Sequence, residues 1–496
     1  MSGHAASDAT LRAARAALAV GASLLVGAAF TAVVRVALPR ALGPEAYGGY
    51  RIAESAAELV LILLSLGLDT TLRRDVAREP AQAGARLWDV IRLRSIGGTG
   101  IAVLGVLVLA ISGVSPTVLV LFTTFVLAQL LVSLSNAHTA TLHAVGDARW
   151  PAVASVAARA LWAFLALGFL YGGAPPLLVA GALVFSEGLR LLVLHRRSVQ
   201  RHGRTVARRG GGIPRAAWVA AAASLPIFIN FVAHSLYARL GTWVLGVQAS
   251  ALEVGWYSAA ANIAGVALLG MPLVTWILLP AAARAGAGSE ADRDQLVVGA
   301  LRAALLFAVP GALLLSLVAA PLVALVFGAA FAPASVALAR LAPTIGLAYL
   351  ATIAAVSLIE RGRERTVAAV SVAGLLVSVG LTLVLARPST PGAAAAGAAT
   401  AALLTECAVT TAMLALAWRR AWSAPLARTA AGLVAVASIL AVLDRPAVLA
   451  LPLVFQLIGL VVAVVAPLLL LRAIRPADLA FARAILRREP AHVVTH

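Results

Sequence analysis

The chain of 496 residues contains no lysine, so all 39 of its basic residues are arginine. A P-loop needs its lysine to bind nucleotide phosphates, and Schiff-base chemistry needs a lysine amine. Cys407 is the single cysteine, which excludes an intramolecular disulfide and a cysteine-based metal site. We therefore expect no ATP hydrolysis by a P-loop. We also expect no bound metal and no organic cofactor.

Charged residues are scarce, at 12% of the chain against about 25% in an average soluble domain. Hydrophobic residues make up 62%, and the mean hydropathy is +0.98. This composition predicts an all-α polytopic membrane protein. A membrane-spanning helix needs about 20 mainly apolar residues. Fourteen stretches qualify: 17–38, 51–68, 95–112, 117–140, 152–171, 176–194, 217–245, 256–280, 297–320, 336–358, 367–386, 393–417, 427–443 and 448–471.

The arginines between these stretches predict the orientation of the chain. With the N-terminus inside, the cytoplasmic segments hold 29 arginines and the outer loops hold 3. Because short cytoplasmic loops accumulate lysine and arginine, we expect a multi-pass protein of the cytoplasmic membrane with both termini in the cytoplasm. The same asymmetry explains the net charge of +19, so we expect no nucleic-acid partner.

A long basic loop at 195–216 divides the chain near its middle, and its glycines and Pro214 favour a flexible linker. We expect an N-lobe at 1–194, a C-lobe at 217–418, two further helices within 419–471 and a cytoplasmic tail at 472–496. A Glu–Gly–Tyr pattern occurs early in each half, at Glu45, Gly48 and Tyr50 and at Glu253, Gly255 and Tyr257. This repeat predicts two lobes related by an axis along the membrane normal, with the binding site between them.

The second apolar stretch begins with charged residues. Arg51, Glu54 and Glu58 stand at positions i, i+3 and i+7, which is one face of a helix. Residues 40–50 are expected to form the turn before this helix. Charges inside a membrane helix are costly and usually face a cavity or a partner. We predict that this face lines a polar cavity through which a charged substrate passes.

Several motifs carry a family resemblance. ALGPEAYGGY (41–50) and LGLDTTLRRDVARE (66–79) flank the second stretch, and SLPIFINF (224–231), EVGWYSAA (253–260) and LVFGAAFAPASVALARLAP (325–343) follow in the second half. In this order, the chain resembles the polysaccharide-transporter (Wzx-type) flippases of the multidrug/oligosaccharidyl-lipid/polysaccharide (MOP) exporter superfamily. One departure is Gly241–Thr242, where many relatives carry an acidic residue.

The resemblance implies about fourteen helices in two pseudo-symmetric six-helix lobes, V-shaped and MATE-like, plus two C-terminal helices. It implies a monomeric flippase, not an enzyme, that moves a polyprenyl-diphosphate-linked oligosaccharide from the inner to the outer leaflet by alternating access. The expected partners are this lipid-linked substrate, membrane lipids, and the polymerase or glycosyltransferases of cell-surface polysaccharide synthesis. A proton or Na⁺ would be the coupling ion.

Arginine binds a diphosphate through a planar, bidentate fork. We predict that Arg35, Arg51 and Arg159 bind the substrate diphosphate; the alternative for Arg35 and Arg51 is snorkelling to the outer interface. Glu187 and Arg190 stand at i and i+3, and we expect them to form a structural ion pair.

Three acids and three polar residues complete the predicted site. Glu54, Glu58 and Glu406 either bind the coupling ion, since burial favours the protonated form of a carboxyl group, or pair with arginine. Asn230, His234 and Tyr237 share one helix face and either contact sugar hydroxyl groups or hydrogen-bond to other helices.

Two other functions remain open. A transporter of the same fold could carry a peptidoglycan lipid precursor or a cationic drug. A drug/cation antiporter would favour a cavity rich in acidic residues, whereas this chain has seven arginines within its predicted helices. A polyprenyl-linked glycosyltransferase or polymerase would need catalytic groups on its outer loops. Those loops offer only Glu45, Glu253 and Asp444, which are widely separated.

Overall fold

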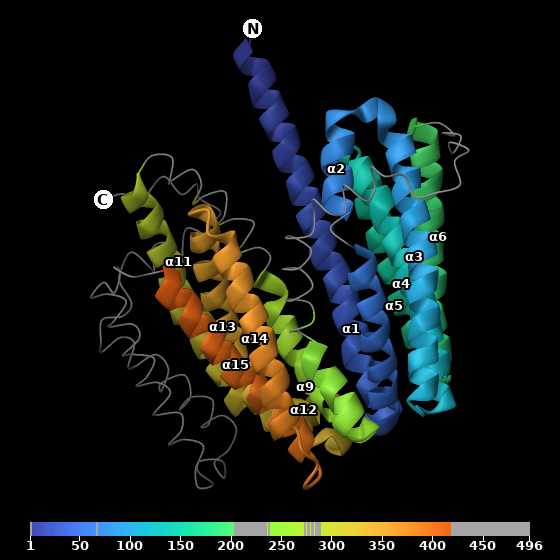
Figure 1. The fold of residues 1–496 in the computed structure, drawn as a ribbon, viewed down its shortest axis with the longest axis vertical. Coiled ribbons are helices and arrows are strands. Elements are labelled where there is room, and N and C mark those ends of the chain that lie inside the picture. The colour runs from blue at the N-terminus through green and yellow to red at the C-terminus, as the bar shows by residue number, and fades with distance from the viewer. Residues whose placement is uncertain are drawn as a thin grey trace. The chain divides into compact units, whose positions relative to one another are not determined.

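The computed structural model describes residues 2–65, 68–202, 239–271 and 289–417, with the single residues 236, 274, 278 and 282 (Figure 1). All regular elements in these ranges are helical. The α-helices are α1 (Ser2–Ser65), α2 (Leu68–Arg78), α3 (Ala83–Ile111), α4 (Pro116–Ala144), α5 (Arg149–Tyr171), α6 (Pro176–His202), α9 (Ala251–Ala267), α11 (Glu290–Leu317), α12 (Ala319–Phe327), α13 (Ala334–Glu360), α14 (Glu364–Leu385) and α15 (Ala393–Ala417).

Ten helical segments in the described part of the chain are long and apolar enough to cross a membrane. They include predicted spans one to six and eight to twelve, with the first two joined in Val26–Leu64. The protein is therefore an all-α, multi-pass membrane protein. Most of 217–245, both spans within 419–471 and the tail 472–496 lie outside the described residues, so the count of fourteen and the lobe boundaries stay predictions.

α1 contains a kink at Gly43, where φ is 75° and ψ is 167°. Glycine adopts this left-handed φ without a steric penalty. Pro44 follows, and proline suits the start of a helix because the N–H it lacks would have no intrahelical partner there. The predicted turn at 40–50 is wrong, since the helix resumes directly after Gly43. Tyr47 and Tyr50 therefore lie on the helix that carries Arg51.

Several helices extend beyond the predicted membrane spans, and α3 and α6 are two of them. α3 begins at Ala83 rather than at residue 95, because its first turns carry Leu87, Val90 and Leu93 on a buried face. α6 continues to His202, eight residues into the predicted linker that begins at 195. The arginines near these ends are tolerated in a helix because arginine has a high helix propensity.

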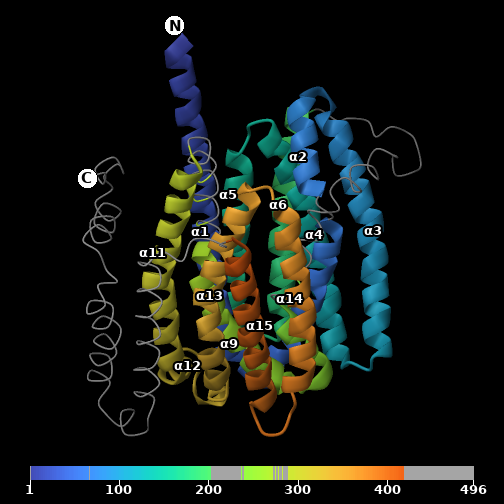
Figure 2. The same cartoon turned by 60° about the vertical axis from the view of Figure 1, so that its left-hand side comes forward.

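The chain divides into two compact units, Met1–Asn262 with Val326–Phe331, and Ile263–Leu325 with Ala332–His496. In the first unit, α4 packs against α1, α3 and α6, and α5 packs against α1 and α6 (Figure 1). The amphipathic α2 lays Leu68, Leu72 and Val76 over the ends of α3 and α4. In the second unit, α13 packs against α11 and α15, and α14 covers α15 (Figure 2).

A buried arginine joins α2, α3 and α4. Arg94 of α3 is only 2% exposed. Its Nη2 donates to Oδ1 of Asp69 on α2 at 2.9 Å, and its Nη1 donates to the carbonyl oxygen of Ser133 on α4 at 2.6 Å. A guanidinium group held by two other helices in this way fixes how α2 sits on the unit.

We expect Arg94→Met to lower the free energy of unfolding by about 2 kcal/mol, because it removes the hydrogen bonds of a buried guanidinium group to the Ser133 carbonyl oxygen and to Asp69, and hydrogen bonds to charged groups contribute about 1.5–3 kcal/mol. Arg74→Met is the matched control, since Arg74 on α2 is 52% exposed and, within the described ranges, its ion pair is with the adjacent Asp75. Thermal unfolding in detergent micelles should separate the two variants clearly. Equal melting temperatures would contradict a stabilising role for the Arg94 contacts.

Candidate functional site

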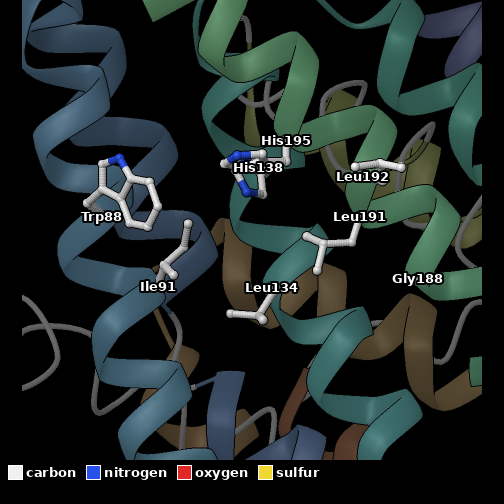
Figure 3. A pocket seen from close by; sticks show the side chains of 8 residues that line it. All are labelled: Trp88, Ile91, Leu134, His138, Gly188, Leu191, Leu192 and His195. Carbon is white, nitrogen blue, oxygen red and sulfur yellow. The ribbon is translucent and has the colours of Figure 1, made fainter. Parts of the chain in front are cut away.

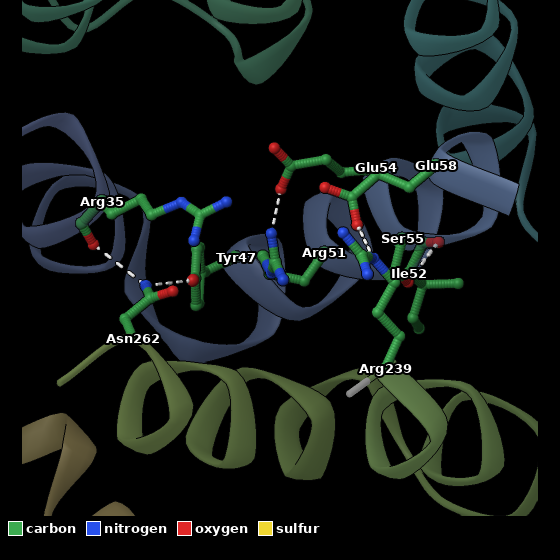
Figure 4. A network of polar contacts seen from close by, with 9 residues as sticks. All are labelled: Arg35, Tyr47, Arg51, Ile52, Glu54, Ser55, Glu58, Arg239 and Asn262. Carbon is green, nitrogen blue, oxygen red and sulfur yellow. Dashed lines mark hydrogen bonds and ion pairs between the residues drawn. The ribbon is translucent and has the colours of Figure 1, made fainter. Parts of the chain in front are cut away.

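The second half of α1 presents its charged residues on one face, as their spacing predicts (Figure 4). The Arg51 guanidinium donates through Nη1 to the Glu54 carboxylate, one helical turn away. Glu58, one turn further, accepts from Nε of Arg239 at 2.5 Å. Arg239 begins a helical segment at 239–248 that precedes α9. The contact therefore joins residues 181 positions apart.

Asn262 of α9 connects both sides of the Gly43 kink. Its side-chain Nδ2 donates to the carbonyl oxygen of Arg35 at 3.1 Å and to the Tyr47 hydroxyl oxygen at 2.7 Å (Figure 4). Asn262 is 7% exposed and Tyr47 is 1% exposed. Arg35 precedes the kink and Tyr47 follows it, so these two bonds fix α9 against both parts of α1. Neither Asn262 nor Tyr47 is among the predicted site residues. An asparagine in an apolar stretch is unusual, and this signal could have identified Asn262.

Arg35 completes this group, which we name the arginine network: Arg35, Tyr47, Arg51, Glu54, Glu58, Arg239 and Asn262. The Arg35 side chain is exposed, and its guanidinium group lies beside Tyr47 (Figure 4). No ion pair to Arg35 occurs within the described residues. The network holds three guanidinium groups and two carboxylates, so its formal charge is +1. Such a site attracts an anion, and Arg35 is its accessible cationic group.

Arg159 lies in a different place from Arg35 and Arg51. It is on α5 and packs over Gly27 of α1, eight residues before Arg35, which is about 12 Å along a helix. Arg159 interacts electrostatically with Glu187 and Arg190 of α6. The structure therefore separates the three predicted diphosphate ligands into two groups.

The predicted ion pair on α6 is confirmed. Arg190 donates through Nη1 to Oε2 of Glu187 at 3.0 Å. Its Nη2 also donates to Oδ1 of Asn136 on α4 at 3.4 Å. Together with Arg159, this second group has two guanidinium groups and one carboxylate, and so also an excess positive charge.

Other predicted site residues lie elsewhere. Glu406 is 8% exposed on α15, in the second compact unit. Asn230, His234 and Tyr237 lie outside the described residues, so their contacts with sugar stay predictions. Within the described part of the chain, no cluster of three or more histidine, cysteine, aspartate or glutamate residues could hold a metal ion.

The two copies of the repeated motif contact each other. A Cβ on Gly48 of α1 would collide with the carbonyl oxygen of Ala251, and a Cβ on Gly255 of α9 would collide with that of Pro44. The two helices therefore meet backbone to backbone, which only glycine permits at both positions. This close contact brings α9 near enough for Asn262 to reach Tyr47.

Comparison with known proteins identifies the family. A family model described as polysaccharide biosynthesis protein matches residues 14–286, more than half of the chain. The chain belongs to this family. The match confirms the resemblance seen in the motifs. It covers the arginine network, Arg159 and the α1–α9 contact, so these features lie in the part of this polysaccharide biosynthesis protein that the family shares.

Several solved structures have a fold similar to that of this chain. The lipid II flippase MurJ in an inward closed conformation has a TM-score of 0.68 at 13% identity, covering 95% of this chain and 99% of that one. The Vibrio cholerae MATE transporter VcmN in its bent form has a TM-score of 0.53 at 17% identity, covering 82% and 98%. The MATE multidrug transporter DinF-BH has a TM-score of 0.58 at 16% identity, covering 82% and 95%. No curated protein sequence matches significantly.

Gly241, one of the two residues where many relatives carry an acidic residue, packs against Tyr257. A Cβ at this position would collide with the ring and hydroxyl of Tyr257 on α9. An acidic side chain would therefore fit only if Tyr257 moved. In this chain the Tyr257 ring fills the space that such a side chain would enter.

Proposed function

We propose that this polysaccharide biosynthesis protein is a flippase that moves a polyprenyl-diphosphate-linked oligosaccharide from the inner to the outer leaflet of the cytoplasmic membrane, for cell-surface polysaccharide synthesis. It acts by alternating access as a monomer with both termini in the cytoplasm. Its partners are the lipid-linked substrate, the surrounding lipids, and the polymerase or glycosyltransferases that use the product. No step requires an enzymatic activity of the chain itself.

The observation that carries this proposal is the arginine network. All of its residues except Arg239 stand on candidate membrane spans, where each charge is costly unless it serves a partner or a ligand. Three of its groups are arginines, whose forks match phosphate oxygens, and Arg35 is exposed without an ion-pair partner in the described ranges. A diphosphate supplies the negative charge that the network lacks. Arg159 and the Glu187–Arg190 pair offer a second cationic position along α1.

The two acids of the network act first as partners of arginine. Glu54 binds Arg51 and Glu58 binds Arg239, which is the alternative to ion coupling that the sequence left open. These pairs orient the guanidinium groups and lower the net charge that the membrane must tolerate. Coupling to a proton or Na⁺ through Glu54, Glu58 or Glu406 stays a prediction, and it would require the corresponding pair to open during the cycle.

A peptidoglycan lipid precursor is the second candidate cargo. One observation favours it: MurJ, a lipid II flippase, covers 95% of this chain with a TM-score of 0.68, whereas the two MATE transporters described above cover 82%. The low identity of 13% limits this likeness to the fold. The arginine network suits either cargo, because its chemistry selects for an anionic phosphate group and not for a particular sugar.

Leaflet exchange tests the proposal directly. The full chain is reconstituted in vesicles with a fluorescent polyprenyl-diphosphate oligosaccharide, and a membrane-impermeant reductant destroys the dye on the outer leaflet. We expect protein-dependent loss of the protected fluorescence. Empty vesicles and vesicles with heat-unfolded protein supply the background rate.

The choice of lipid decides between the candidates. A fluorescent lipid II analogue and a neutral polyprenyl glycoside are run in parallel with the oligosaccharide lipid. Exchange of the lipid II analogue alone would assign the second cargo. No protein-dependent exchange of any diphosphate lipid would overturn the flippase function, and equal exchange of the neutral lipid would overturn the role of the diphosphate.

A further inference from the structure

A cavity of about 340 Å³ lies between α3, α4 and α6, three helices that carry none of the network residues (Figure 3). Each helix contributes one aromatic residue and at least one residue without a polar side chain. The lining residues are Trp88 and Ile91 of α3, Leu134 and His138 of α4, and Gly188, Leu191, Leu192 and His195 of α6. The volume falls within the range of about 300–1,000 Å³ typical of ligand pockets. The proposed flipping uses none of these residues.

The cavity has a polar end and an apolar end. Trp88 stands five residues after α3 begins, His138 six residues before α4 ends, and His195 seven residues before α6 ends. Because successive helices are antiparallel, these three positions lie near the same end of the unit. Ile91, Leu134 and Gly188 lie deeper along the same helices. An occupant therefore meets aromatic nitrogen groups at one end and hydrocarbon at the other.

The aromatic groups are held in fixed contact. The His138 and His195 rings meet edge to face with centroids 5.4 Å apart, and Trp88 meets His195 in the same way at 6.2 Å. His138 Nδ1 lies 2.9 Å from Oγ of Ser198, which fixes the orientation of its ring. Tryptophan is enriched where a membrane helix reaches the headgroup level. The polar end of the cavity thus has the character of a membrane interface.

Arginines follow directly beyond this polar end. Arg196 and Arg201 on the last turns of α6 are exposed, and neither has an ion-pair partner in the described part of the chain. Arg197 pairs with Asp147 at 2.8 Å. Basic residues at the end of a membrane helix attract anionic lipids. The charge and the cavity together match an amphiphile with a negatively charged head.

We propose that this cavity binds one acyl chain of an anionic phospholipid. The phosphate-bearing headgroup lies at Arg196, and the chain passes His195 and Trp88 to end at Gly188 between Leu134 and Ile91. The site is separate from the substrate path, and its existence does not depend on the proposed function. The bound chain fills the space between α3, α4 and α6 that their own side chains leave open.

Fluorescence quenching tests the site on the full-length protein in detergent micelles. The probe is phosphatidylglycerol with brominated acyl chains, which quenches tryptophan on contact. We expect saturable quenching whose Trp88 component is lost in Trp88→Phe, while the other eight tryptophans give the background quenching. We expect brominated phosphatidylcholine to bind about fivefold more weakly, because its headgroup carries no net charge. Arg196→Gln should weaken phosphatidylglycerol binding by a similar, roughly fivefold factor.

Glycines on α6 provide a matched pair of variants. A Cβ at Gly188 meets only Leu131 at 3.9 Å, so Gly188→Leu fits the fold and fills the deep end of the cavity. A Cβ at Gly181, two turns earlier, meets nothing within 4 Å, and Gly181→Leu leaves the cavity open. We expect about tenfold weaker lipid binding for Gly188→Leu, because an added side chain competes for packed space, and unchanged binding for Gly181→Leu.

Three outcomes would overturn the proposal. Equal lipid binding by Gly188→Leu and Gly181→Leu would show that the acyl chain does not lie in the cavity. Equal binding of the two brominated lipids would show that the site does not select an anionic headgroup. Displacement of phosphatidylglycerol by stoichiometric polyprenyl phosphate would assign the cavity to the isoprenoid chain of the substrate instead. Elution volume and circular dichroism of each variant establish that it is folded, and Arg196→Gln tests the site without altering its packing.

Discussion

Replacing Arg35 and Arg51 together with alanine should slow leaflet exchange of a polyprenyl-diphosphate lipid about a hundredfold. Each arginine supplies charge-assisted hydrogen bonds worth about 1.5 kcal/mol, and about 1.4 kcal/mol corresponds to a factor of ten. The double variant also changes the formal charge of the arginine network from +1 to −1. The network would then repel the diphosphate that it attracts in the native protein. The fluorescent exchange assay described above measures this rate.

Two further variants separate binding from folding. Arg51→Ala leaves Glu54, whose side chain is 16% exposed, without its arginine partner. Adding Glu54→Gln removes this unpaired charge, so a stability defect should be relieved while exchange stays lost. Arg35→Lys with Arg51→Lys keeps the charge but loses the bidentate fork, and we expect an intermediate rate. Since the native chain has no lysine, the new amines are also the only side-chain amines available for chemical modification.

The control must remove the same charge elsewhere. Arg73→Ala with Arg78→Ala removes two exposed arginines from α2, outside the network. This variant should exchange lipid at the native rate. Exchange unaffected by the loss of Arg35 and Arg51 would refute the site, and full recovery on adding Glu54→Gln would mean that these arginines serve only the fold.

The sequence predicts what depends on local spacing. Runs of about 20 apolar residues identify most of the described membrane helices, because the bilayer sets their length. The spacing of Arg51, Glu54 and Glu58 places them on one face, as observed. The Glu187–Arg190 pair follows from the same one-turn rule. Each of these features is decided within a single helix.

Contacts between distant segments could not be predicted in the same way. Glu58 pairs with Arg239 and Asn262 binds Tyr47 because α1 and α9 pack closely, and no periodicity encodes which residue lies opposite. The kink at Gly43 escapes prediction for another reason. A Gly–Pro pair is equally typical of a longer turn, although proline after a left-handed glycine can restart a helix at once, as it does here.

The contact between Gly48 and Gly255 predicts a large loss of stability on the addition of a single methyl group. Gly48→Ala places a Cβ against the Ala251 carbonyl oxygen, and Gly255→Ala places one against that of Pro44. A backbone atom has no rotamer by which to move aside, so α1 and α9 must separate. Overpacking of this kind costs about 1–3 kcal/mol, even though alanine favours a helix more than glycine does.

Gly49 is the matched control, because it is the next residue on the same helix. A Cβ there meets only Val118 at 3.5 Å, an ordinary contact. Gly49→Ala should therefore be neutral or stabilising by up to about 1 kcal/mol through helix propensity. Thermal unfolding in detergent micelles compares the variants, and a Gly48→Ala protein as stable as Gly49→Ala would refute the close contact.

The double variant tests whether the two glycines act at one contact. Once Gly48→Ala has moved the helices apart, Gly255→Ala meets Pro44 at a greater distance, so the combined loss should be smaller than the sum of the two. Separation of α1 and α9 also lengthens the hydrogen bonds from Asn262 to Tyr47 and to Arg35. We therefore expect the glycine variants that remain folded to exchange lipid slowly, although each keeps every arginine of the network. Strict additivity would mean that the glycines act at independent sites.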